Sequence, residues 1–293
     1  MDDLDGQLAR ARAKGGVFAV PEGLRLRLSG SDSLRYLNGQ ITRDLRHLTP
    51  GAALLACLLT PKGKLCALLS IHRDGDDLIV ESDAKVGDSL RERLERYLVA
   101  DDVLITEECW PERVHLFGEK AESAKGSAGF VALSRLGVPG FDVPADSRNP
   151  ADAGLALLDP FVIEILRIER GIPKWGNELG PETLPPEAGL DRTCIDYDRG
   201  CYPGQEVISR LKSIGRVNRL LHGFRGDSLR QGMRIHGADG GEFGSLTSAG
   251  KLPGTQECVA LGYLPRGTEG PLLASDPLTG ERTPLSIAAT FGT

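Results

Sequence analysis

The segment 198–210 places a cysteine and a cation directly before a predicted helix, and it reads DRGCYPGQEVISR. Proline fits the first turn of a helix because the N–H that it lacks would be unpaired there, so we expect the helix to begin near Pro203. Apolar residues recur at helical spacing from Val207 onward, and Gly215 is a typical helix stop.

Cys201 therefore lies near the positive end of the predicted helix dipole, two residues after Arg199. The helix dipole and the positive charge of Arg199 both favour the thiolate, which is the form of cysteine that attacks disulfides and binds metals. The alternative is a buried structural cysteine in a turn, which is the commoner fate of free cysteine. A glycine-rich turn flanked by charges is an unusual place for a core residue, and we favour the reactive interpretation.

The same segment resembles the Lys-Gly-Cys-Tyr-x-Gly-Gln-Glu signature of the YgfZ-type folate-binding proteins. These proteins are relatives of the glycine-cleavage T-protein, an aminomethyltransferase, and they serve iron–sulfur cluster assembly and maintenance. Arg199 stands where the family usually has lysine, which keeps the charge but removes an amine that could lose its proton. The resemblance extends over nearly the whole chain, through the segments 28–42, 59–64, 167–173, 184–188 and 244–248.

The resemblance implies that tetrahydrofolate, or another folate derivative, occupies a central cavity with Cys201 at its mouth. Cys201 is then the residue that carries the chemistry, and Tyr202 is the candidate for stacking on the pterin ring. The other folate-binding candidates are Glu169, Arg199, Gln205, Asp83 and Asn38. Asp83 takes the place of an asparagine that lies near folate in the T-protein, whereas Asn38 also fits a simple turn residue.

Glu169 has two interpretations. It follows Leu166 by three residues and Val162 by seven, so helical geometry places its carboxylate on a largely apolar face. It could equally be a helix-end glutamate paired with Arg167 or Arg170 in solvent. The resemblance favours the first interpretation, because the matching glutamate of the T-protein family binds the pterin ring. A carboxylate accepts two parallel N–H bonds from an aminopyrimidine edge.

The function that we expect is a folate-binding accessory protein for iron–sulfur enzymes, including those that thiolate tRNA. The alternative is a folate-dependent aminomethyltransferase or demethylase-like enzyme, and a third hypothesis is an interaction module that binds no folate. Asp88 is the nearest match to the catalytic aspartate of the T-protein, but its spacing differs by one residue. We therefore expect chemistry at sulfur rather than enzymatic one-carbon transfer.

Composition excludes several other classes of protein. The 293 residues are 40% hydrophobic and 26% charged, with a formal net charge of −6, which argues against direct nucleic-acid binding. A solvated helix face explains the basic cluster at Arg210, Lys212, Arg216 and Arg219.

No apolar run is long enough to span a bilayer, and the acidic first residues do not resemble a signal peptide, so we expect a cytoplasmic protein that contacts no membrane. The six cysteines include no Cys-x-x-Cys pair, and no metal site is expected.

The pattern of predicted elements is α+β. Strands are expected over 24–28, 52–59, 64–72, 78–81, 103–105, 114–117, 130–133 and 138–143, with helices over 84–98 and from Asp159 to Gly171. Glycine-punctuated apolar runs after Gly215 predict a small C-terminal β-barrel. With the resemblance, this predicts a GcvT-like folate-binding region over 1–216, made of two interwoven subdomains around a central cavity, and a barrel domain over 217–293.

Overall fold

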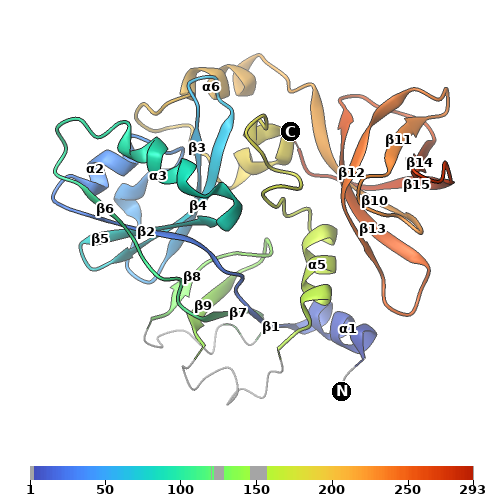
Figure 1. Cartoon of the computed structure of the whole chain (residues 1–293), viewed down its shortest axis with the longest axis horizontal. Helices are drawn as coiled ribbons and strands as arrows, with labels where there is room; N and C mark the ends of the chain where they lie inside the picture. Colours follow the sequence, from blue (N-terminus) through green and yellow to red (C-terminus); the bar gives the residue numbers. More distant parts are fainter. Residues whose placement is uncertain (1–2, 120, 122–128, 146–156, 293) are drawn as a thin grey trace.

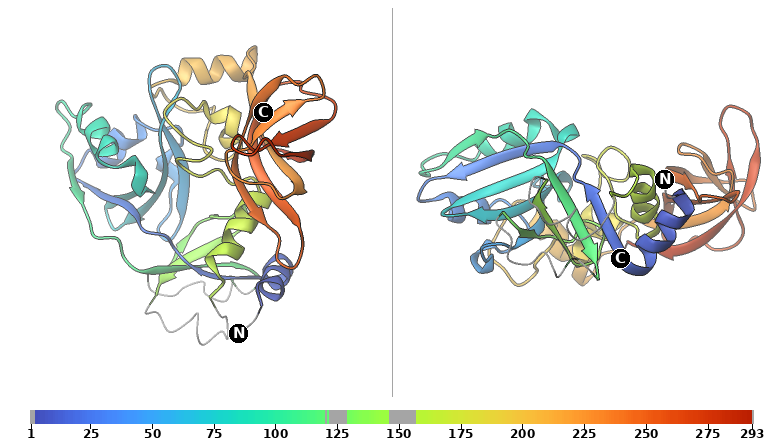
Figure 2. Two further views of the ribbon diagram at one scale, coloured as in Figure 1. Left: turned by 45° about the vertical axis from the view of Figure 1, so that its right-hand side comes forward. Right: turned by 90° about the horizontal axis from the view of Figure 1, so that it is seen from below.

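The computed structural model describes residues 3–119, 121, 129–145 and 157–292. Their strands form two open sheets and one closed barrel. In Figure 1 the five-stranded sheet lies on the left, the four-stranded sheet below it, and the barrel on the right, with helix α5 between the sheets and the barrel. Figure 2 shows the same three parts from two further directions.

The five-stranded sheet is antiparallel throughout and has the strand order β3-β4-β5-β2-β6. Its alternating sequences bury one row of side chains under α2 and α3, with Leu26 and Leu28 completely buried. The elements are β2 (Gly23–Ser29), α2 (Ser33–Asn38), β3 (Ala53–Leu59), β4 (Leu65–Asp74), β5 (Asp77–Asp83), α3 (Asp88–Glu95) and β6 (Leu104–Glu107).

The four-stranded sheet has the order β1-β7-β9-β8 and is flanked in sequence by α1 and α5. Helix α5 forms as predicted: Asp159 accepts a hydrogen bond from the N–H of Phe161 at 2.8 Å, and Pro160 occupies the first turn. The elements are α1 (Leu4–Lys14), β1 (Gly15–Ala19), β7 (Arg113–Gly118), β8 (Val131–Ala132), β9 (Gly140–Pro144) and α5 (Pro160–Glu169).

The C-terminal strands close into a barrel with the order β10-β13-β12-β11-β14-β15. The barrel has its own apolar core around Phe224, Ile235 and Leu246, and α5 packs against β12 and β13. Its strands are β10 (Arg219–Asp227), β11 (Arg234–Gly237), β12 (Glu242–Lys251), β13 (Glu257–Pro265), β14 (Leu272–Ser275) and β15 (Arg282–Thr290). The α+β fold with a C-terminal barrel is thus confirmed, whereas the domain division at 216/217 stays a prediction.

Two predicted helices have different boundaries. The helix expected over 84–98 is a short 3₁₀ turn followed by α3, because Gly87 interrupts it with a φ of 58°. The helix after the cysteine is α6 (Gln205–Ser213), which begins two residues later than expected. Gly204, in the left-handed conformation at φ 87°, precedes it, so Pro203 belongs to the turn and not to the first helical turn.

Candidate functional site

A cavity of about 320 Å³ lies where the two open sheets meet α5. Residues from β1, β4, β5 and α5 line it, together with the segment 172–179 that follows α5. This volume is in the range of small-molecule sites, and most of its walls are apolar side chains with a few polar groups among them. The polar and aromatic residues in its wall are Phe18, Glu22, Ser70, Glu81, Ser82, Asp83, Trp110, Arg135, Glu164, Arg167, Lys174 and Trp175.

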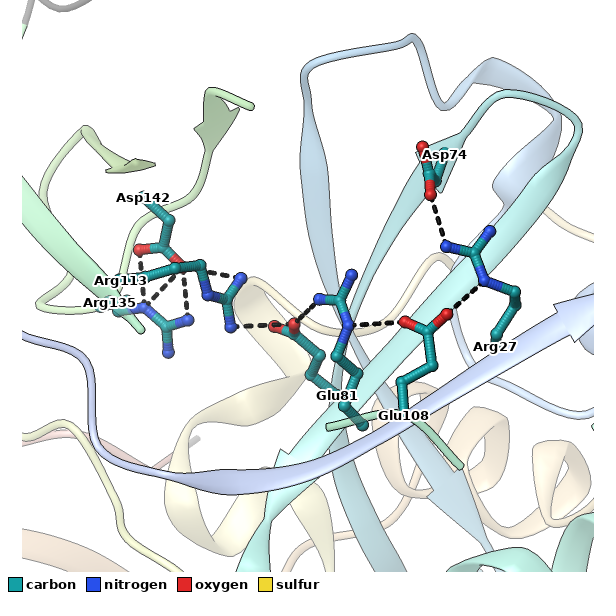
Figure 3. A network of polar contacts seen from close by, with 8 residues as sticks. Arg27, Asp74, Glu81, Glu108, Arg113, Arg135 and Asp142 are labelled. Carbon is teal, nitrogen blue, oxygen red and sulfur yellow. Dashed lines mark hydrogen bonds and ion pairs between the residues drawn. The ribbon is translucent and has the colours of Figure 1, made fainter. Parts of the chain in front are cut away.

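Glu81 is a buried carboxylate of the cavity wall whose charge is already neutralised. Its Oε1 accepts a hydrogen bond from Nη1 of Arg25 at 2.5 Å and lies 2.8 Å from Nη2 of Arg113. Figure 3 shows it as one link in a row of alternating charges that reaches Asp142 on one side and Asp74 on the other. The two arginines fix the position of this carboxylate and occupy one of its oxygens.

Glu164 is the carboxylate that α5 presents to the cavity. Arg167, one turn along the helix, donates to both of its oxygens, at 3.0 and 2.7 Å. Burial by itself would raise the pKa of Glu164, but the hydrogen bonds and charge of Arg167, with the charge of Lys174, hold the pKa below its usual value. Arg167 is held in turn by Glu178 at 3.0 Å, so Glu164 is an ionised and well-ordered acceptor.

Two donors in the cavity wall have no hydrogen-bond partner among the described residues. They are Nε1 of Trp110 and Oγ of Ser70, and both atoms are buried. A buried polar group without a partner costs about 1–3 kcal/mol, so such groups are rare unless a ligand or water satisfies them. The cavity therefore offers an ionised acceptor, Glu164, together with donors that a ligand oxygen or nitrogen could use.

Arg135 enters the cavity wall from a buried ion-pair cluster behind it. Its guanidinium donates to both oxygens of Asp142, and His115 contacts the same carboxylate through Nδ1 at 2.8 Å. Burial would raise the pKa of Asp142, but Arg135 and His115 keep it well below its usual range. Burial lowers the pKa of His115, so this histidine is neutral and serves to position Asp142 and Arg135.

The loop that carries Cys201 is a separate structure on the surface. The Cys201 side chain is exposed, and Gly204 packs onto the turn between β3 and β4. Arg199 holds the loop by donating to the backbone carbonyls of Asn38 and Arg43. These contacts tie the cysteine to the segment after α2, in a place where a thiol is accessible to another protein.

No family model matches the chain. The chain is 27% identical over 237 residues to the tRNA-modifying protein YgfZ of Escherichia coli O7:K1, a match that covers 69% of each chain. It is 28% identical over 295 residues to an aminomethyltransferase of Rubrobacter xylanophilus, covering 88% of this chain and 78% of that protein. The crystal structure of glycine cleavage system aminomethyltransferase T from Bartonella henselae superimposes with a TM-score of 0.79 over 98% of this chain and 88% of that one, at 18% identity. The chain is thus similar in sequence to YgfZ proteins and to an aminomethyltransferase, and it has the fold of the GcvT aminomethyltransferases.

The residues expected to bind folate do not all meet at one place. Asp83 lines the cavity, where its Oδ1 accepts from the N–H of Lys85 at 2.9 Å. Glu169 does not line it: the carboxylate pairs with Arg12, with one bond of 3.1 Å. The physical reason is helical rotation, since five residues turn the chain by about 500° and place Glu169 on the other side of α5 from Glu164. Glu169 therefore lies outside the wall of this cavity, and its role in folate binding stays a prediction that its contacts do not favour.

Tyr202 likewise lies outside the wall of this cavity. Its ring is only 7% exposed and packs into the main core, under the guanidinium of Arg199, whose Cζ lies 5.3 Å from the ring centre. Burial raises the pKa of Tyr202 to about 12. A ring in this position does not line the cavity, and its contacts help to hold the loop, so its stacking on folate stays a prediction that the structure does not favour.

Asn38, Arg199 and Gln205 come together, but around the cysteine loop and not in the cavity wall. Oδ1 of Asn38 accepts from the N–H of Leu45 at 2.7 Å, and Nε2 of Gln205 reaches the carbonyl of Arg199 at 3.5 Å. Cys201 itself is not among the residues that line the cavity. The contacts of all three side chains are those of residues that hold a loop.

The sequence analysis missed several residues of the cavity wall. Glu164 lies in an apolar stretch of α5, and its pairing with Arg167 at three residues' spacing is the signal that could have found it. Trp175 also lines the cavity, where its partly exposed side chain packs against two apolar core clusters. Within the described ranges, no group of three or more His, Cys, Asp or Glu residues could hold a metal ion, and no helix has the length and apolarity needed to cross a membrane.

Proposed function

We propose that this protein binds a tetrahydrofolate in the cavity and acts as an accessory protein for iron–sulfur enzymes, including those that thiolate tRNA. The observation that carries the proposal is that the ionised carboxylate of Glu164 and two donors without a partner line the same small-molecule-sized cavity. The curated name of the YgfZ relatives, tRNA-modifying protein, supports the second half of the proposal.

A reduced pterin matches this set of groups. Its aminopyrimidine edge carries adjacent N–H donors that a carboxylate accepts in parallel, and Glu164 is the carboxylate best placed to do so. The ring oxygen and nitrogens are acceptors for the free donors of Trp110 and Ser70. Trp175 adds an aromatic surface, and the exposed Lys174 supplies a positive charge for the carboxylates at the other end of a folate.

Cys201 is the group proposed to act on the client. Its thiolate can exchange with a thiol or disulfide of the client protein, or transiently hold a sulfur species or cluster. The exposure of its side chain and the rigid attachment of its loop through Arg199 support this role. Cys57, Cys194 and Cys258 are buried and unsuited to it.

A folate-dependent aminomethyltransferase is the second candidate, and the relative of that name with 28% identity favours it. Such an enzyme needs an acid–base group near the folate, which supplies roughly 10²–10⁴-fold in rate. Asp88 is exposed at the start of α3 and does not line the cavity. Of these two aspartates only Asp83, which takes the place of an asparagine of the T-protein, lines the cavity and could serve. We expect no turnover of methylene groups on folate.

Complementation tests the proposed function. In a host that lacks its own YgfZ-type protein, the wild-type chain should restore the activity of iron–sulfur enzymes that thiolate tRNA. Cys201→Ala should abolish the rescue, whereas Cys109→Ala, which removes the other exposed thiol, should leave it intact. Full rescue by Cys201→Ala, combined with loss of rescue by Asp83→Asn, would replace this proposal with the transferase.

A further inference from the structure

A second cavity, of about 570 Å³, lies where α6, the segment before it and the barrel meet. Four cations line it, and they come from four separate places in the chain. Arg192 belongs to a 3₁₀ turn, Lys212 to the end of α6, Arg216 to the linker that follows, and Arg266 to the loop after β13. We call these four residues and the cavity between them the basic groove.

The four cations of the basic groove form no ion pair among the residues that the structure describes. By contrast, the neighbouring Arg219 pairs with Glu187 at 3.0 Å. Lys212 lies 3.4 Å from the ring centre of Tyr197, and Arg192 makes a single long bond of 3.4 Å to a backbone carbonyl. All four side chains are exposed, so their charges are available to a ligand.

A solvated helix face does not account for this arrangement. The negative end of the helix dipole favours Lys212 at the end of α6, but Arg192 and Arg266 belong to other elements and are brought there by the fold. Like charges held close together repel one another and disfavour the folded state. The protein as a whole has a net charge of −6, but the wall of this cavity holds four cations and one acid, Asp191. The basic groove is therefore a positively charged site on a negatively charged protein.

We propose that the basic groove binds a phosphate-bearing ligand. A planar guanidinium group can donate two parallel N–H bonds to the oxygens of one phosphate. The basic groove has three arginines that can bind in this way, and Lys212 adds a further positive charge. Tyr197 adds an aromatic wall. A nucleoside phosphate and the phosphates of an RNA are two sources of this chemistry. The inference goes beyond the proposed function, because neither the folate cavity nor Cys201 takes part.

The test compares two double variants that remove equal charge. The groove variant combines Arg216→Gln with Arg266→Gln and so removes two of the four charges of the basic groove. The control variant combines Arg96→Gln with Arg282→Gln, which removes two exposed cations elsewhere that form no ion pair with another described residue. Binding of inorganic pyrophosphate, ATP and an unmodified tRNA transcript is measured by calorimetry at two salt concentrations. The groove variant should bind at least about tenfold more weakly than the wild type, and the control within about twofold.

The probes distinguish the sources of the phosphate. Preferential binding of ATP identifies a nucleotide site, and preferential binding of the transcript identifies RNA and overturns the compositional expectation of no direct nucleic-acid contact. In either case, the affinity should fall as salt rises. The proposal is wrong if no probe binds the wild type at millimolar concentration, or if the two double variants bind equally. Melting temperatures of both variants confirm that they fold, because these exposed side chains make no structural ion pair.

Discussion

At the scale of single residues, Glu164 and Glu169 carry the clearest contrast. Both are on α5 and both pair with an arginine, but Glu164 lines the cavity whereas Glu169 contacts Arg12 on α1. The resemblance to the T-protein family indicated Glu169. The structure supports Glu164 as the carboxylate that meets a ligand. Periodicity and charge alone do not show which of two glutamates five residues apart on an amphipathic helix faces a cavity. That depends on how the helix is rotated about its axis against its neighbours.

The two glutamates form a matched pair for mutation. Glu164→Gln should weaken tetrahydrofolate binding more than about tenfold, because hydrogen bonds to a charged acceptor contribute about 1.5–3 kcal/mol each. Glu169→Gln should leave the dissociation constant within about twofold. Isothermal calorimetry on both variants makes the measurement, and equal loss of binding in the two would remove the assignment of Glu164.

At the scale of elements, the turn before α6 determines where the residues of the cysteine motif lie. The motif predicted a helix after Cys201 correctly, but a left-handed residue at Gly204 delays the helix start and turns Tyr202 into the core. That conformation is required by contact with another element: a Cβ on Gly204 would lie 2.6 Å from the carbonyl oxygen of Thr60. The sequence shows a glycine at position 204, but it does not show that a side chain there would collide with the backbone of Thr60.

Gly204→Ala tests this contact, with Gly232→Ala as its control. Both glycines have nearly the same φ, 87° and 88°, but nothing lies within 4 Å of a Cβ built on Gly232. The control should show the cost of the left-handed conformation alone, about 1 kcal/mol. Gly204→Ala should cost clearly more, and should lower the melting temperature by several degrees beyond the control. Equal melting temperatures would show that the loop does not depend on this packing.

At the scale of the whole molecule, the resemblance predicted the architecture well because its segments spread over nearly the whole chain, so that it indicated the sheets, α5 and the barrel together. The walls of the cavity were harder to predict. Trp110, Arg135 and Glu164 come from three segments that meet only through tertiary packing, and of the three only Glu164 has a local signal, its three-residue spacing from Arg167. The basic groove has the same origin, since its cations are up to 74 residues apart, from Arg192 to Arg266.

Buried histidines should make the stability of the whole protein depend on pH. Burial is the main cause that lowers the pKa of His72, His115 and His222 from the ordinary value of 6.5. Below that pH the unfolded chain takes up protons that the folded protein does not, so stability falls as the pH decreases. The slope is at most about 1.4 kcal/mol per pH unit for each histidine. Urea unfolding at pH 7.5, 6.5 and 5.5 measures it, and an unchanged free energy of unfolding would contradict the burial of these rings.

Tryptophan fluorescence tests folate binding most directly, because the chain has two tryptophans, Trp110 and Trp175, and both line the cavity. The protein is titrated with tetrahydrofolate and with the more stable 5-formyl derivative, and free tryptophan at matched absorbance corrects for light absorbed by the ligand. We predict saturable quenching with one site per chain, which survives in Cys201→Ala and is weakened more than tenfold in Glu164→Gln. A signal that does not saturate, or that saturates equally in Glu164→Gln and the wild type, would contradict folate binding in this cavity.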